Sequence, residues 1–209
     1  NTDYRNWYLG DWATPEGIDQ TDPRSVDLVN NCFVAVCYQT MAKIAQTLGK
    51  PNDQKLYESK NEQLRTLIHK TFYDSKEASY GTGTQIDLVY PMLAGVTPES
   101  QLSNLLNTLY KNTAERFRSH LATGLVGIPI ITEWCIKNQQ VNFMYQMLKK
   151  RDYPSYSYMI DNGATTTWEH WNGERSHIHN CYNGIGTWFY QALAGIMPDE
   201  AHPGYKHVR

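Results

Sequence analysis

The stretch SVDLVNNCFVAVCYQTMAKIAQTLG, residues 25–49, decides the fold class. Apolar side chains recur in it at steps of three and four residues, from Val29 through Met41 to Leu48. This spacing places them on one face of an α-helix, and Gly49 is a typical residue for ending one. The stretch therefore predicts an amphipathic helix.

A second helix is predicted directly after the first. Pro51-Asn52-Asp53 is a typical helix start, and apolar residues from Leu56 to Phe72 fall on one side of the helix that it begins. Only a few residues separate the two helices, so we expect them to form an antiparallel αα-hairpin.

The rest of the chain continues in the same way. We expect further helices at residues 84–93, 98–110, 124–136, 142–149 and 187–196, with Pro129 breaking the third of these. Short apolar helices alternate with longer charged ones, and no convincing strand pattern appears. The predicted class is all-α, a ring of helical hairpins known as an (α/α)6 toroid. Because the pattern gives only about seven helices, we expect an incomplete barrel that lacks its first helices.

Composition and charge exclude several classes of partner. The formal net charge is -2, which gives no electrostatic case for binding nucleic acid or an anionic membrane. No apolar run approaches the roughly 20 residues of a membrane span, and no signal peptide is recognisable. The chain begins with Asn1 rather than Met, so we expect it to be processed or cut from a longer protein. Fifteen Tyr, six Trp and five Phe suit helices that line an aromatic-walled pocket.

The four cysteines carry no recognisable metal spacing. Cys32 and Cys37 lie in one apolar helical run, Cys135 lies in another, and Cys181 lies near the C-terminus. They are predicted to be small buried hydrophobic residues. Neither a disulfide framework nor a reducing compartment follows from them.

The segment GATTTWEHW, residues 163–171, sets Glu169 between Trp168 and Trp171. An ionised carboxylate is buried only when it is paired, neutralised or facing a wet cleft. The indoles favour a cleft for sugar, because the C–H faces of sugar rings pack against them. Glu169 is therefore predicted to be catalytic, with Trp168 and Trp171 as sugar contacts. The alternative is a Glu at a helix N-terminus, capped by one of residues 165–167.

Histidines follow at His177 and His179. A His-x-His pair is a known metal-ligand spacing, but zinc also needs a third or fourth ligand that this segment does not supply. We therefore expect no metal and no cofactor. His179 is predicted to donate a hydrogen bond to a sugar hydroxyl, and a structural histidine is the alternative.

Gly10-Asp11-Trp12 repeats the pairing of a carboxylate with an indole. Asp11 is predicted to bind two vicinal hydroxyls beside Trp12, and an Asx-turn is the alternative. A glycosidase needs two carboxylates, one as acid and one as base. Besides Glu169, only Asp11 and Glu16 lie in comparably aromatic loops, and neither is convincing as the acid. Trp134 and Trp188 are predicted to be core residues.

Taken in order, these motifs resemble the C-terminal part of the (α/α)6-barrel catalytic domain of bacterial α-L-rhamnosidases, glycoside hydrolase family 78. The matching segments are GDW (10–12), HLATG (120–124), YPS (153–155), YMI (158–160), GATTTWE (163–169), SHIH (176–179) and GIGTWFY (184–190). The resemblance covers nearly the whole chain, and the Trp168-Glu169 segment is its most specific part.

The resemblance implies an inverting hydrolase that releases terminal α-L-rhamnose from a rhamnose-containing oligosaccharide or glycoside. It implies that Glu169 is the general base, and that His179, Asp11 and the nearby indoles contact the sugar. In this family the general acid is a Glu in a Cys-Pro-x-Arg-Glu type of loop earlier in the barrel, and this sequence has no such loop. We therefore expect the acid to lie in a missing N-terminal part of the barrel.

The same resemblance implies the domain limits. Residues 1–203 are expected to be the C-terminal part of the catalytic domain, and residues 204–209 the start of a following β-sandwich domain. The chain is then a fragment without turnover of its own. Two other hypotheses stay open: a toroid glycosidase for another sugar, and a carbohydrate-binding module without catalysis.

Overall fold

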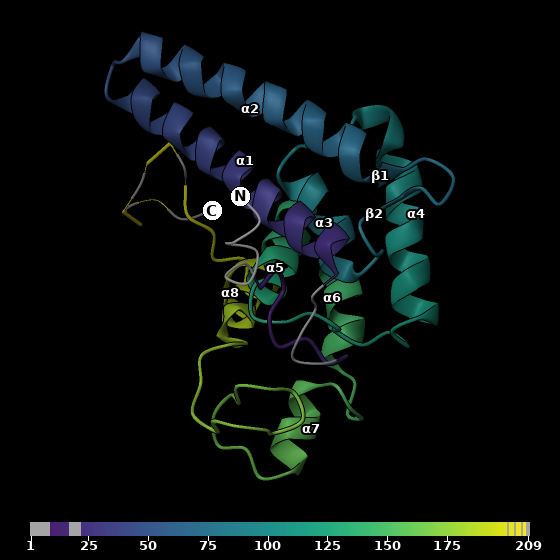
Figure 1. Cartoon of the computed structure of the whole chain (residues 1–209). Coiled ribbons are helices and arrows are strands. Elements are labelled where there is room, and N and C mark those ends of the chain that lie inside the picture. The colour runs from purple at the N-terminus through teal and green to yellow at the C-terminus, as the bar shows by residue number, and fades with distance from the viewer. Residues whose placement is uncertain (1–8, 17–21, 200, 203, 206, 208–209) are drawn as a thin grey trace. The chain divides into compact units, whose positions relative to one another are not determined.

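The computed structural model describes residues 9–16, 22–199, 201–202, 204–205 and 207. These residues form two compact units (Figure 1). The first unit comprises residues 9–12 and 22–112, and the second comprises residues 13–16 and those from 113 onward.

The first helix, α1 (Pro23–Thr47), confirms the prediction from residues 25–49. Asp22 caps its N-terminus by accepting a hydrogen bond from the backbone N–H of Arg24. Proline is favoured at the first helical position, where its missing N–H removes no helical bond. The helix ends before Gly49, whose φ of +64° is a left-handed conformation that glycine adopts without strain.

The second helix, α2 (Pro51–Phe72), packs along α1 as the predicted antiparallel hairpin (Figure 1). Two short strands follow it, β1 (Tyr73–Asp74) and β2 (Ser79–Tyr80), which pair antiparallel with Tyr73 opposite Tyr80. This ribbon is the one pair of strands in the described part of the chain, so the all-α class holds.

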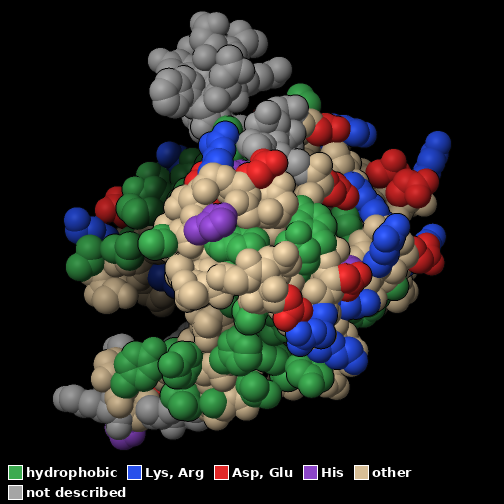
Figure 2. Space-filling view, turned by 90° about the horizontal axis from the view of Figure 1, so that it is seen from below, with side chains coloured by type: hydrophobic (Ala, Val, Ile, Leu, Met, Phe, Trp, Pro, Cys, Tyr) green, Lys and Arg blue, Asp and Glu red, His purple; other side chains and the backbone are tan. Residues whose placement is uncertain are grey.

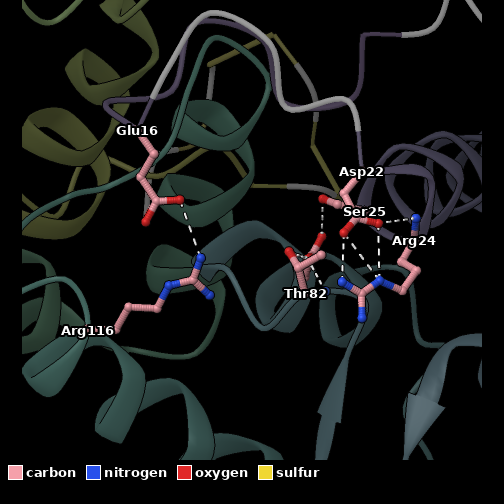
Figure 3. Close-up of polar contacts among 7 residues, drawn as sticks. Glu16, Asp22, Arg24, Ser25, Thr82 and Arg116 are labelled. Carbon is pink, nitrogen blue, oxygen red and sulfur yellow. Dashed lines mark hydrogen bonds and ion pairs between the residues drawn. The ribbon is translucent and has the colours of Figure 1, made fainter.

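Helices α3 (Gln85–Leu93) and α4 (Glu99–Glu115) complete the first unit. Every α3 residue from Gln85 to Pro91 is buried, as expected for an apolar inner helix. The buried positions include Asp87, whose carboxylate accepts hydrogen bonds from Ser25 Oγ at 2.6 Å and from Thr82 N and Oγ1, each at 2.8 Å (Figure 3). These three donors compensate the cost of burying that carboxylate.

The second unit contains shorter helices. They are α5 (Gly127–Lys137), α6 (Val141–Leu148), α7 (Tyr156–Asp161), a 3-10 turn (Asn183–Ile185), and α8 (Gly186–Trp188), which continues as a π-helical turn (Phe189–Leu193). Trp134 of α5 and Trp188 of α8 are buried, which confirms the prediction that both belong to the core.

Several expectations about these elements need correction. Pro129 does not break α5, because it lies in the first turn, where its N–H would have no helical acceptor. The last helical segment ends at Leu193 rather than at residue 196. The short helix α7 was not predicted at all. Three cysteines are buried as expected, but Cys37 is exposed on α1.

Among the described residues, no helix combines the length and the hydropathy needed to cross a bilayer. On the face shown in Figure 2, basic and acidic side chains are interspersed rather than gathered by sign. The expected domain boundary after residue 203 stays a prediction, because residues 203, 206 and 208–209 lie outside the described set.

Candidate active site

The segment around Glu169 is paired with the segment around His179 by backbone hydrogen bonds. The His179 N–H donates to the Thr167 carbonyl at 2.9 Å, and the Glu169 N–H donates to the Ser176 carbonyl at 2.9 Å. Thr167 Oγ1 also donates to Asn183 Oδ1 at 2.7 Å. These bonds form a short ladder, residues 167–169 against 176–179. The ladder explains how two groups ten residues apart in sequence come to lie on neighbouring backbone segments.

The side chain of Glu169 is partly exposed. Its relative accessibility is 14%, and its Oε2 accepts a hydrogen bond from the Ser176 N–H at 3.2 Å. Its Oε1 lies 3.8 Å from Arg175 Nη1 and 3.8 Å from His170 Nε2. At these distances neither cation forms a bidentate clamp on the carboxylate.

Glu169 is not part of a helix cap. The backbone from residue 164 to residue 182 contains no helix, so no helix N-terminus lies at Glu169 for it to complete. The alternative interpretation as a structural cap is therefore wrong. A partly exposed carboxylate with one oxygen outside direct hydrogen bonds is chemically able to take a proton from water.

Trp171 lies inside an aromatic cluster. Its side chain is 1% exposed, and its indole N–H donates to the Thr123 carbonyl at 2.8 Å. The ring stacks on Tyr182 with centroids 4.3 Å apart and meets the edge of Tyr156. These contacts support a role in fixing the loop that carries Glu169, and direct contact of Trp171 with a sugar stays a prediction.

Trp168 is also buried, on the other side of Glu169 in the sequence. The His177 ring stacks on the indole at 4.9 Å, and a side chain at Gly173 would come within 2.9 Å of Trp168 Cζ3. The residues around the indole therefore leave it 5% exposed. Its predicted contact with a sugar likewise stays a prediction.

The His179 ring is half-buried, and one of its nitrogens is already bonded. The Cys181 N–H donates to His179 Nδ1 at 3.2 Å. A nitrogen that accepts a hydrogen bond carries no proton, so the neutral ring carries its proton on Nε2. His179 is therefore in the tautomer that donates a hydrogen bond from Nε2, as the predicted contact with a hydroxyl requires.

His177 and Cys181 are the other potential ligands or nucleophiles of this segment. His177 Nε2 lies 2.7 Å from the Gly173 carbonyl oxygen. A carbonyl only accepts, so Nε2 carries the proton that is donated in this hydrogen bond. Within the described residues, no group of three potential ligands is placed to hold a metal ion. Burial, together with the nearby negative charge of Glu169, raises the pKa of the Cys181 thiol to about 11, so the thiol stays protonated at neutral pH.

The remaining predicted carboxylates are not part of this ladder. Asp11 and Trp12 belong to the first unit, where Asp11 is almost fully buried and Trp12 half-buried. Glu16 belongs to the second unit and forms an exposed ion pair with Arg116, Oε2 to Nη2 3.3 Å (Figure 3). The structure thus brings Glu169, His179 and the two indoles together in one unit.

Comparison with known proteins agrees with this fold and these motifs. Residues 1–193 match the family described as the bacterial alpha-L-rhamnosidase 6 hairpin glycosidase domain. The chain belongs to this family. Its helical hairpins are therefore part of an (α/α)6 toroid, as the sequence predicted.

The relatives are α-L-rhamnosidases of greater length. The enzyme of that name from Formosa agariphila is 30% identical over 213 residues, which is 96% of this chain and 23% of the relative. The α-L-rhamnosidase structure from Dictyoglumus thermophilum has a TM-score of 0.83 and 28% identity, over 93% of this chain and 23% of that one. The structure of the Streptomyces avermitilis α-L-rhamnosidase complexed with L-rhamnose has a TM-score of 0.82 and 26% identity. The match covers 96% of this chain and 19% of that one.

Sequence reasoning did not assign Arg175 a role beside Glu169. Arg175 has a φ of +62°, a left-handed conformation that is uncommon for Arg, and its guanidinium approaches Glu169. His170, the next residue in the sequence, is buried and approaches the same oxygen. The Arg175 contact has no signature in the sequence, because it depends on how the loop turns back on itself.

Proposed function

We propose that the protein containing this chain hydrolyses terminal α-L-rhamnosides with inversion, and that Glu169 is its general base. The observation that carries the proposal is the setting of Glu169 in a loop rather than a cap, partly exposed and unclamped. Membership of a glycosidase family supports the reaction class, and the names of the relatives support the sugar.

In the proposed reaction, one carboxylate takes a proton and another gives one. Glu169 removes a proton from a water molecule as the water oxygen bonds to the anomeric carbon of rhamnose. The bond to the leaving oxygen breaks, and a second carboxylic acid protonates that oxygen. In inverting glycosidases the two carboxyl groups lie about 6.5–9.5 Å apart, which leaves room for the water. We place the second group outside these 209 residues.

Three of the other predicted site residues are proposed to bind the sugar. His179 donates from Nε2 to a hydroxyl, which its bond with the Cys181 N–H supports. Asp11 and Trp12 provide a carboxylate and an indole from the first unit. Trp168 and Trp171 act chiefly by holding the loop, because both rings are buried.

The proposal is tested by the change Glu169→Gln in the full-length protein. Loss of a general base lowers turnover by about 100- to 10,000-fold, so we expect kcat on an aryl α-L-rhamnoside to fall in that range. Glu174→Gln is a matched control, because this exposed Glu lies in the same loop, and its turnover should stay within about twofold of wild type. Near wild-type turnover in Glu169→Gln would contradict the assignment.

The stereochemistry and the sugar are tested separately. NMR of the first product formed should show the β-anomer of rhamnose if the mechanism inverts, and the α-anomer would contradict inversion. Aryl glucosides and uronides should be poor substrates. Faster hydrolysis of either would favour a toroid glycosidase for another sugar, and sugar binding without hydrolysis would favour a carbohydrate-binding module.

A further inference from the structure

A polar cavity lies in the first unit, and none of its lining residues is among those assigned to catalysis or sugar binding. Its volume is about 570 Å³, and it lies between α2 and the loop that joins α3 to α4. Asn61, Arg65 and His69 line it from one side, on successive turns of α2, and residues 95–98 line it from the other. Seven of the ten lining residues are polar or charged.

On the α2 side of the cavity, two side chains carry a buried polar atom without a hydrogen-bond partner. Asn61 is only 8% exposed, and its Oδ1 is buried without a donor. Arg65 Nε, one turn further along α2, is buried without an acceptor. Buried polar atoms are nearly always paired, and leaving one unpaired is destabilising. Both residues line the cavity, so a small rotation of each side chain would present its unpaired group to a ligand able to donate and accept at once.

The loop opposite α2 is shaped around the Arg65 guanidinium. Gly95 follows α3 with a φ of +67°, and a Cβ built on it would lie 3.1 Å from both Arg65 Cζ and Nη2. A side chain at this position would therefore crowd the guanidinium. The absence of one lets the loop pass close to Arg65 while the guanidinium stays at the cavity wall.

His69 supplies a second donor. Its Nδ1 lies 2.6 Å from the hydroxyl of Tyr80, which is fully buried. Burial raises the pKa of Tyr80, so the phenol stays protonated and donates to Nδ1. Burial also lowers the pKa of His69, which keeps the ring neutral with its proton on Nε2. The ring is held flat against Tyr73, with centroids 4.8 Å apart.

The charges of the lining decide between ligand classes. Glu58 and Glu62 place two carboxylates at the cavity, which disfavours phosphate and other anions. Arg65 disfavours a cation in the same space. A sugar is neutral, and each of its hydroxyls both donates and accepts, so it satisfies Arg65 and the carboxylates together. We propose that this cavity is a second, non-catalytic carbohydrate-binding site.

The site itself rests on the geometry of the first unit, and only the choice of rhamnose as a probe rests on the proposed function. The test uses the full-length protein labelled with ¹⁵N at its histidines, with the ring signals of His69 and His179 assigned from His69→Gln and His179→Gln. On titration with L-rhamnose or a rhamnose disaccharide, the His69 signal should shift and saturate. A shift of the His179 signal reports separately on sugar binding at the proposed catalytic site. The cavity proposal and the proposed function can therefore fail independently of each other.

Variants locate the binding. Arg65→Met, and the milder Glu62→Gln at an exposed lining residue, should weaken the His69 response at least tenfold and leave the His179 response unchanged. Lys70→Met is the matched control, since Lys70 is exposed on α2 outside the cavity lining and its loss should change neither signal. Three results would overturn the proposal: a His69 signal that does not shift on addition of sugar, one that shifts equally with inorganic phosphate, or a sugar response that is the same in Arg65→Met as in wild type.

Discussion

The Glu169 carboxylate is influenced by its neighbours without being locked by them. Two unit charges 3.8 Å apart, the Arg175–Glu169 separation, attract by about 4 kcal/mol at an effective dielectric constant of 20. Arg175 is 55% exposed, and pairs of this kind are worth about 0–1 kcal/mol in solution. The smaller figure applies, because water screens the guanidinium. Glu169 can therefore exchange its partner for a water molecule at little cost.

Gly173 gives a test of how tightly the loop is packed against Trp168. Gly173→Ala meets two penalties: a φ of +82°, and a contact of 2.9 Å with the indole. We expect a loss of about 2–4 kcal/mol in the free energy of unfolding, measured with urea, together with reduced turnover.

Gly163 separates the two penalties. It has a similar φ of +87°, but a Cβ there would meet open space. Gly163→Ala should therefore lose only about 1–2 kcal/mol, the penalty of a left-handed backbone for alanine. Equal losses in the two variants would show that the contact with Trp168 is not tight.

At the scale of residues, the sequence predicted a chemical role for Glu169, which stays a prediction, but not the contacts around it. The run Trp168-Glu169 indicated a functional carboxylate, because an acidic group between two indoles is unusual. It did not indicate that the indoles would turn inward, with Trp171 bonded to the Thr123 carbonyl. That bond joins residues 48 positions apart, and no local pattern encodes it.

At the scale of elements, Asp87 joins three parts of the first unit. Asp87 itself lies in α3. Its carboxylate accepts hydrogen bonds from Ser25 of α1 and from Thr82 in the loop before α3. Hydrogen bonds to a charged group contribute about 1.5–3 kcal/mol each, more than neutral ones. The relative placement of α1 and α3 therefore depends on one buried side chain.

Ser25→Ala tests this junction. Removing the hydroxyl takes one donor from a buried carboxylate, so we expect a loss of about 1.5–3 kcal/mol in the free energy of unfolding by urea. Thr40→Ala is the control within the same helix. The exposed Thr40 hydroxyl donates a hydrogen bond to the Val36 carbonyl one turn earlier in the same helix. Thr40→Ala should therefore change the free energy of unfolding by no more than about 0.5 kcal/mol. A similar effect of both changes would contradict the role given to Asp87.

The elements that were predicted correctly share strong local signals. Helices α1 and α2 are long, periodic and bounded by Pro and Gly, so pattern alone locates them to within about two residues. Helix α7 has six residues and no apolar period, so only its capping Ser155 marks it. The β1–β2 ribbon has two residues per strand, too few for an alternating pattern.

At the scale of the whole molecule, the family relationship is clear while the chain is short. It spans less than a quarter of the length of the relatives to which it is compared, at 23% for the Formosa agariphila enzyme. A glycosidase mechanism needs a proton donor as well as a base. Under the proposed mechanism, we expect this donor to lie outside these 209 residues.

The proposed division of the two carboxyl groups can be tested by comparing the chain with the full-length protein. The 209-residue chain alone is expected to release no aryl alcohol from an α-L-rhamnoside above the uncatalysed rate, because in the proposed mechanism it holds the base but not the acid. The full-length protein should turn over the same substrate in the same assay. Turnover by the short chain would show that its own residues supply both groups, and the search for the acid would then return to Asp11 and Glu16.

The ladder between residues 167–169 and 176–179 has a consequence for motion at the site. Since Ser176 bonds both the backbone and the carboxylate of Glu169, a shift of residues 176–179 carries Glu169 and the neighbouring imidazole of His179 together. Loop motion that keeps these bonds thus preserves the spacing between the two groups, and warming that breaks the ladder displaces the proposed base and the proposed sugar contact in a single event.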